Sequence, residues 1–85
     1  MKRLELKQIL EKCSDESRKY YRQYPTLYRD LILWEDYLLC VEVRRTKKQR
    51  ALKNKARLDI METYQISDKT FYTICRRLRE LCEDV

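Results

Sequence analysis

The sequence predicts an all-α protein with four to five helices. Three observations carry this prediction: glycine is absent, proline occurs once in 85 residues, and apolar residues recur at helical spacing along most of the chain. Tight β-hairpin turns and phosphate-cradling loops need glycine, because they require positive φ angles or a close backbone approach. A chain this short leaves much of its surface exposed, so a monomer would be marginally stable and a partner would add to its stability.

The first helix is predicted over Lys2 to Cys13. One face of this segment is apolar at steps of three and four residues. It consists of Leu6, Ile9, Leu10 and Cys13. Ser14 and Asp15 then offer a break and a helix cap, although Ser17 stands where a full capping box would have Glu.

A second short helix is predicted over residues 16–24, and Pro25 ends it, because proline cannot donate to the preceding turn. Tyrosines alternate here with arginine and lysine: Tyr20, Tyr21, Tyr24 and Tyr28. This alternation suits stacking on single-stranded nucleic acid, whereas the steps of three and four between the last three tyrosines suit a packed core or a protein interface. Core or interface is the preferred interpretation.

Thr26 is the expected cap of a third helix that runs to about Val43. Its buried stripe recurs at steps of four, three, four and three. The stripe consists of Leu27, Leu31, Trp34, Leu38 and Val41. Residues 37–43 also alternate as a strand would, but no glycine provides a hairpin turn and no second strand is evident, so a helix is preferred.

Residues 46–49 match a capping box, which predicts a fourth helix from residue 47 to Tyr64. Its apolar residues, with Met61 beside them, recur every four positions: Leu52, Ala56, Ile60 and Tyr64. Ser67 is a good N-cap for a last helix, and Asp68 lies favourably at the positive end of its dipole. The buried stripe of that helix consists of Phe71, Ile74, Cys75, Leu78 and either Leu81 or Cys82.

The net charge of +6 comes from one short segment, residues 44–57. It contains eight basic residues and no acid: Arg44, Arg45, Lys47, Lys48, Arg50, Lys53, Lys55 and Arg57. Residues 1–43 carry eight charges of each sign and cancel, while residues 58–85 carry four basic and six acidic residues. Like charges in such a run repel one another until a polyanion lies against them, which indicates nucleic-acid contact. An anionic protein or membrane surface, or plain solvation, are the alternatives.

The composition argues against an enzyme. Histidine is absent, so the commonest general base and zinc ligand are missing. No nucleophile pairs with a base in the sequence pattern. We therefore expect no catalytic residues, no metal, no cofactor and no small-molecule substrate.

The four cysteines, Cys13, Cys40, Cys75 and Cys82, form no Cys-x-x-Cys pair. A zinc site built from them has no spacing signature, so reduced, buried cysteines that act as small apolar residues are preferred. No secretory pattern follows Met1, and the longest apolar stretch, Leu31 to Trp34, is far too short for a membrane span. A cytoplasmic protein without membrane contact is the expectation.

Residues 57–79 resemble the helix-turn-helix DNA-binding unit. Ile60, Met61 and Tyr64 fill the apolar positions of its first helix, Ile66 fills the buried turn position, and Ser67 is the cap. Phe71 and Ile74 fill the inward positions of the recognition helix. These apolar positions bury the corner between the two helices and leave the front of the second helix free for the major groove.

Two positions depart from that pattern. Gln65 stands where the family often has glycine, so it has to adopt a left-handed backbone at some cost. Met61 stands where the family often has alanine or glycine, which implies a slightly wider helix crossing.

The resemblance implies double-stranded DNA as the partner. The outward residues of the last helix are the candidates for reading bases: Lys69, Thr70, Tyr72, Thr73 and Arg76. The candidates for phosphate contact are the eight basic residues of 44–57 together with Ser67 and Arg77. Pairing with Glu80, Glu83 and Asp84 is the alternative role for Arg76, Arg77 and Arg79, and it is preferred for Arg79.

The expected function is sequence-specific DNA binding, as in small regulators of phages and mobile elements that control transcription or assist recombination or packaging. The alternative is a helical adaptor that binds another protein. Residues 1–43 are expected to form a docking or oligomerisation half, through which the chain forms a homo-oligomer or binds a protein partner. Residues 44–85 are expected to hold the basic helix and the helix-turn-helix, the two halves forming one compact domain.

Overall fold

The computed structural model describes residues 1–45 and 52–85, and the side chains of residues 43–53 lie outside what it describes. Five helices follow one another along the described residues: α1 (Arg3–Glu11), α2 (Asp15–Gln23), α3 (Leu27–Arg45), α4 (Leu52–Tyr64) and α5 (Asp68–Leu81). No strand occurs among these residues, and residues 37–43 belong to α3. The all-α prediction is therefore confirmed. No helix within 1–45 or 52–85 is long and apolar enough to cross a membrane.

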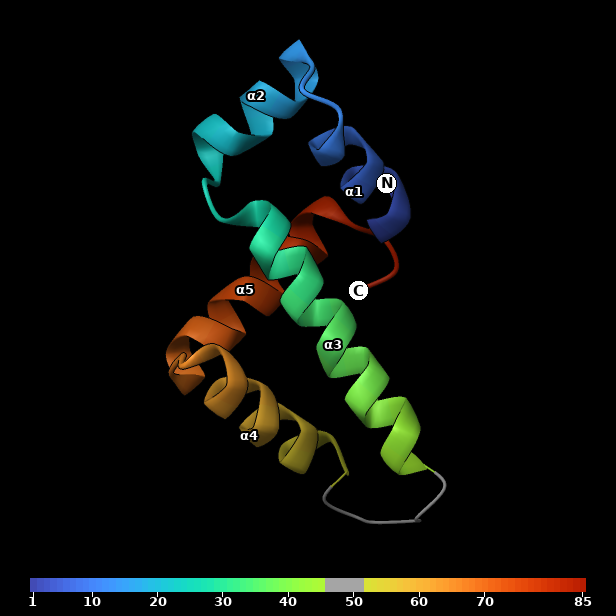
Figure 1. The fold of residues 1–85 in the computed structure, drawn as a ribbon, viewed down its shortest axis with the longest axis vertical. Coiled ribbons are helices and arrows are strands. Elements are labelled where there is room, and N and C mark those ends of the chain that lie inside the picture. The colour runs from blue at the N-terminus through green and yellow to red at the C-terminus, as the bar shows by residue number, and fades with distance from the viewer. Residues whose placement is uncertain (46–51) are drawn as a thin grey trace.

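The longest helix, α3, contacts α1, α4 and α5 (Figure 1). α1 packs on its beginning and α4 lies along its second half, while α5 crosses both α3 and α4. The chain ends meet beside α1, because the Glu83 amide donates to the Met1 carbonyl at 2.8 Å and Arg3 pairs with Asp84 at 3.4 Å. α3 is thus the element on which both halves of the chain assemble.

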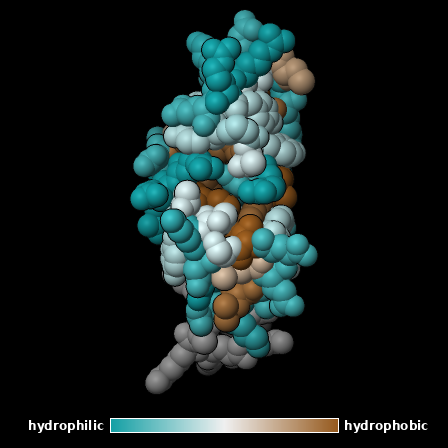
Figure 2. Space-filling model, turned by 90° about the vertical axis from the view of Figure 1, so that its left-hand side faces the viewer, coloured by the Kyte–Doolittle hydropathy of each residue, from teal (hydrophilic) through white to brown (hydrophobic). Residues whose placement is uncertain are grey.

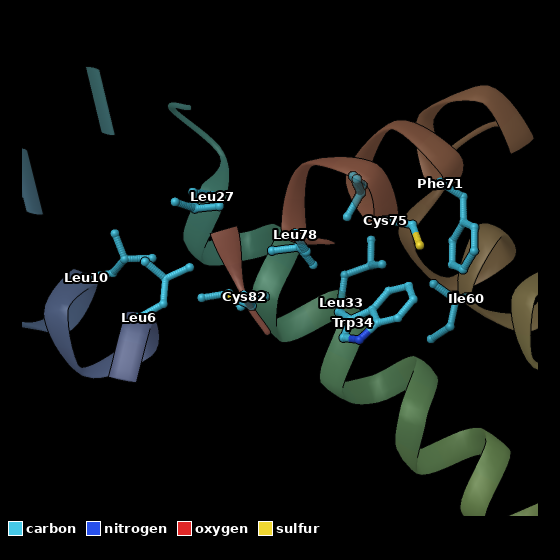
Figure 3. Close-up of a cluster of buried hydrophobic side chains, with 12 residues drawn as sticks. Leu6, Leu10, Leu27, Leu33, Trp34, Ile60, Phe71, Cys75, Leu78 and Cys82 are labelled. Atoms are coloured by element: carbon cyan, nitrogen blue, oxygen red, sulfur yellow. The ribbon is translucent and has the colours of Figure 1, made fainter. Parts of the chain in front are cut away.

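One apolar core runs through the whole molecule (Figure 3). At one end, Leu6 and Leu10 of α1 point toward the beginning of α3 and the end of α5. At the other end, Trp34 of α3 meets Phe71 of α5 with ring centroids 6.1 Å apart, and Ile60 of α4 lies beside them. The apolar stripe predicted for the last helix is buried as expected, including Cys82 just beyond its end.

The turn between α1 and α2 departs from expectation in two ways. α1 ends at Glu11, so Cys13 falls after the helix and is exposed instead of lying on its buried face. Ser17 completes a capping box in place of Glu, because the Ser14 amide donates to its hydroxyl at 3.0 Å while the Ser17 amide donates to Ser14 at 3.2 Å. Ser17 is also buried, so this capping box lies inside the fold.

The cysteines divide into two groups. Cys75 and Cys82 are buried in the core, as predicted, and burial raises the pKa of the Cys82 thiol. Cys40 is half-buried and Cys13 is exposed, so the prediction that all four are buried was wrong for these two. Among the described residues no three His, Cys, Asp or Glu side chains gather as metal ligands do.

Residues 65–67 form the turn between α4 and α5, and Gln65 has the predicted left-handed backbone with φ of 53°. The Ile66 amide donates to the Met61 carbonyl at 3.0 Å, and the Gln65 amide donates to Glu62 at 3.4 Å. This pair of hydrogen bonds is the Schellman arrangement that ends a helix at a left-handed residue. Ser67 then caps α5, accepting from the Thr70 amide at 3.2 Å, as predicted.

A side-chain hydrogen bond attaches α4 to α3. The Tyr64 hydroxyl, at the end of α4, donates to the Asp36 carboxylate. This bond, with partial burial, raises the pKa of Tyr64 to about 12. The end of α4, and with it the turn, is therefore held in a defined position against α3.

Replacing Gln65 with Gly is expected to raise the free energy of unfolding by about 0.5–1 kcal/mol. Glycine adopts a positive φ without the clash between Cβ and backbone that Gln65 tolerates. Gln65→Ala keeps the Cβ and is the matched control, with little change expected. Urea denaturation measures both, and a Gly variant less stable than the parent would contradict the left-handed turn.

Replacing Phe71 with Ala is expected to cost about 3–5 kcal/mol, enough to unfold most of so small a domain. Phe71 is 4% exposed and contacts Trp34, Tyr37 and Tyr72. Leu58→Ala is the control, because Leu58 is 48% exposed on α4 and is not part of the apolar core. Thermal unfolding followed by circular dichroism compares them, and a Phe71→Ala melting temperature close to that of the parent would place Phe71 outside the core.

Candidate nucleic-acid interface

The solvent-facing side of α5 carries a row of three polar side chains, Lys69, Thr73 and Arg76. They follow one another at steps of four and three residues, so they lie on one face, opposite the buried Phe71 and Leu78. Lys69 and Arg76 are exposed, and Thr73 donates its hydroxyl to the Lys69 carbonyl at 2.8 Å. The structure thus brings three of the five base-reading candidates together in the recognition row, as we call Lys69, Thr73 and Arg76.

The charged groups of the recognition row have no partner among the described residues. Neither the Lys69 ammonium nor the Arg76 guanidinium makes an ion pair or a hydrogen bond within that part of the chain. Glu80 lies four residues beyond Arg76 on the same helix, yet the two do not pair. Both cations are therefore available to an external acceptor.

Two further candidates, Ser67 and Thr70, lie at the beginning of α5. Ser67 uses its hydroxyl oxygen to accept from the Thr70 amide, and the two hydroxyl oxygens are 3.1 Å apart. Ser67 is exposed and Thr70 is half-buried. Their hydroxyls thus serve the helix cap first, beside the recognition row.

Tyr72, the fifth base-reading candidate, is 58% exposed and lies at the edge of the same exposed face of α5, three residues after Lys69 and four before Arg76. Its ring packs edge-on against Phe71 at 5.8 Å, and the guanidinium of Arg57 lies 5.9 Å from its centroid. It borders a groove of about 480 Å³ between α3, α4 and α5, which Trp34 and Tyr37 also line. Tyr72 therefore lies between the recognition row and this groove.

Arg57 attaches α4 to the beginning of α5. Its guanidinium forms an ion pair with Asp68 and hydrogen bonds with the Asn54 side chain and the Met61 sulfur. The Arg57 side chain is 17% exposed. Its described partners thus lie on α4 and at the beginning of α5, although the sequence pattern predicts a phosphate contact for Arg57.

Arg77, another phosphate candidate, is held by α3. Its guanidinium lies 3.0 Å from the carboxylate of Asp30 and 4.9 Å from the ring centroid of Tyr24. Asp30 is completely buried, and it also pairs with Arg29 at 3.4 Å and accepts from the Thr26 hydroxyl at 3.4 Å. Thr26 was expected to cap α3, and its hydroxyl donates to Asp30 instead.

Sequence reasoning missed Asp30 and its partners, although one signal was present. Asp30 lies three residues after Leu27 and four before Trp34, so it shares their buried face. A carboxylate at such a position has to find cations, because an unpaired buried charge is strongly unfavourable.

Of the basic segment, Lys55 is exposed on α4. The other phosphate candidates there have side chains outside the described residues: Arg44, Arg45, Lys47, Lys48, Arg50 and Lys53. Figure 2 shows the side of the molecule where α4 and α5 meet, with hydrophilic residues around a narrow band of apolar ones.

The tyrosine cluster of residues 20–28 packs against the core. All four rings are partly buried. Tyr21 donates its hydroxyl to the Leu10 carbonyl at 3.2 Å, and Tyr28 donates to Glu11 at 3.0 Å. These contacts favour the interpretation of the cluster as core over stacking on single-stranded nucleic acid.

Comparison with known proteins gives no relative from which a role could be transferred. The chain matches no known family model, no curated protein and no solved structure.

Proposed function

We propose that this chain binds double-stranded DNA and reads sequence with α5, with α4, the turn and α5 acting as a helix-turn-helix. The observation that carries the proposal is the recognition row, whose two cations have no partner among the described residues. Its helix is fixed from behind by the core and at its beginning by the Ser67 cap. A rigid helix with a free cationic face is what insertion into the major groove requires.

The residue types of the recognition row suit base edges. An arginine such as Arg76 can donate two parallel hydrogen bonds to O6 and N7 of guanine, and a threonine methyl such as that of Thr73 can contact the thymine methyl. Lys69 can donate to guanine or to a phosphate. The recognition row therefore combines hydrogen-bond donors and an apolar contact that can all lie in the major groove of a duplex.

Affinity is proposed to come from residues 44–57. Their eight basic residues carry the whole positive excess of the chain. Phosphate contacts of this kind position a protein on the duplex and contribute free energy without reading sequence. α4 begins within this segment and leads directly to the turn, so phosphate contact there would also orient α5.

By analogy with small helix-turn-helix proteins, the biological role proposed is transcription regulation, or assistance to recombination or packaging in a phage or mobile element. A cytoplasmic location follows from that role. Residues 1–43 are proposed to mediate self-association or protein docking, supported by two exposed leucines, Leu4 at 63% and Leu39 at 59%.

The alternative function, a helical adaptor for another protein, is supported by the groove that Tyr72 borders. Its volume of about 480 Å³ and its apolar lining by Trp34, Leu38 and Phe71 suit a protein side chain or helix. Binding of duplex DNA over a salt series separates the two functions. Loss of affinity with rising salt supports DNA binding, and no duplex binding at low salt would overturn it in favour of the adaptor.

The triple variant of Lys47, Lys48 and Arg50 to Ala is expected to weaken binding to all duplexes about equally. Each phosphate contact contributes about −0.9 to the slope of log affinity against log salt, so the slope should flatten by roughly three units at most. The control replaces three exposed lysines of the N-terminal half, Lys2, Lys12 and Lys19. Equal salt slopes for the parent and the triple variant would show that these basic residues do not contact the DNA.

Arg76→Ala is expected to cost about 1–3 kcal/mol of binding free energy on a duplex selected for tight binding, and much less on scrambled DNA. Arg44→Ala should weaken both by similar factors. Arg79→Ala is the matched control. Arg79 is also exposed on α5, but it is not part of the recognition row and borders the apolar groove that Tyr72 also borders. Competition between the two duplexes measures the difference, and equal losses for Arg76→Ala would make Arg76 a phosphate contact only.

A further inference from the structure

A hollow of about 250 Å³ lies between the beginning of α3 and α5, beside the recognition row. Three cationic side chains border it: Arg29, Lys69 and Arg77. Asp30 is the one acid among the described residues that line it. The charged side chains around this hollow therefore carry a formal net charge of +2 at neutral pH.

Asp30 holds the two arginines without using up their donors. Its Oδ2 lies 3.0 Å from Nη1 of Arg77, and its Oδ1 lies 3.4 Å from Nη2 of Arg29. A guanidinium has five N–H donors, and the described hydrogen bonds engage one nitrogen of each arginine. Both side chains thus keep donors for a second acceptor.

Arg77 is fixed from two directions. Asp30, which is 0% exposed, holds one end of its guanidinium, and the ring of Tyr24 lies 4.9 Å from its central carbon. Such an arginine has lost its rotamer freedom during folding, so binding an anion costs little further entropy. Lys69, which is exposed and unpaired among the described residues, borders the same hollow.

A purely structural role accounts for only part of this arrangement. A single arginine would neutralise Asp30 and attach α5 to α3, and buried ion pairs contribute little net stability. Two arginines and a lysine around one carboxylate instead leave a concentrated positive charge. That charge becomes favourable when an anion with several acceptor oxygens enters, and guanidinium groups match the oxygens of a phosphate.

We propose that this hollow binds a phosphate of the DNA backbone, with Arg29, Arg77 and Lys69 as ligands and Asp30 as the residue that positions the two arginines. The inference rests on the proposed function. Thr73 borders the hollow and also belongs to the recognition row, so a phosphate bound here lies next to the residues proposed to read bases. This contact fixes the register of α5 in the groove, and Arg29 and Asp30 supply it from α3, outside residues 57–79.

The test uses Arg29→Gln in the full chain. Arg29 is 53% exposed, and its removal leaves the Asp30–Arg77 pair intact, so the fold should persist by circular dichroism. The affinity for selected and scrambled duplexes should fall by the same factor, and the salt slope should flatten by about 0.9. Lys19→Gln removes an exposed cation from α2, away from the hollow, and should leave the slope unchanged.

Duplexes with one neutral methylphosphonate in place of a phosphate locate the contact. One such position should weaken binding by the parent while leaving the Arg29→Gln affinity unchanged, because the variant already lacks that contact. A parent and an Arg29→Gln variant with equal salt slopes, both binding duplex, would overturn the phosphate pocket and leave the proposed function intact. A parent chain that binds no duplex at low salt would overturn the proposed function, and the pocket inference with it.

Discussion

The packing of α3 against α5 is the contact on which the rest of the structure depends. Trp34 of α3 and Phe71 of α5 meet at its centre, and Asp30 and Arg77 pair at its edge. Leu6 of α1 and Ile60 of α4 belong to the same buried cluster as the apolar residues of α3 and α5. The N-terminal helices and α4 therefore both bury apolar residues against this contact.

This packing also decides which residues meet solvent. Because the core fixes one side of α5, the opposite side is presented, and the cations Lys69 and Arg76 on it remain unpaired among the described residues. The flanks of α5 differ from each other. One borders the apolar groove with Tyr72, and the other borders the cationic hollow with Arg77. The proposed DNA contact uses the presented side and the cationic flank, while the apolar flank is the surface that suits a protein partner.

Periodicity predicted the helices and most of the core, because burial in a helical protein follows the 3.6-residue repeat. It also placed Phe71, Ile74 and Leu78 inward and Lys69, Thr73 and Arg76 outward. The resemblance to the helix-turn-helix added the left-handed Gln65, which the structure has. Helix ends were less predictable. The first helix was predicted to end at Cys13 but ends at Glu11, so Cys13 is exposed.

Pairing of charges could not be predicted in the same way. Asp30 and Arg77 are 47 residues apart, and Arg57 finds Asp68 across a helix junction, so no local pattern relates them. The run of eight basic residues predicts the same phosphate contact for each of them. Arg57, the last of the eight, instead forms an ion pair with Asp68 within the fold. Tyr72 is outward as predicted, at 58% exposed, but its contact with Arg57 depends on the packing of α4 and could not be predicted from spacing.

The central claim is that α5 presents its recognition row to duplex DNA. Amide chemical shifts of the ¹⁵N-labelled chain, followed as duplex is added at low salt, test this claim most directly. The account predicts large changes on residues 69–77, on Arg29 and within residues 44–57, with small changes at the groove residues Trp34, Tyr37 and Leu38. Changes confined to those groove residues, or no changes at all, would contradict it.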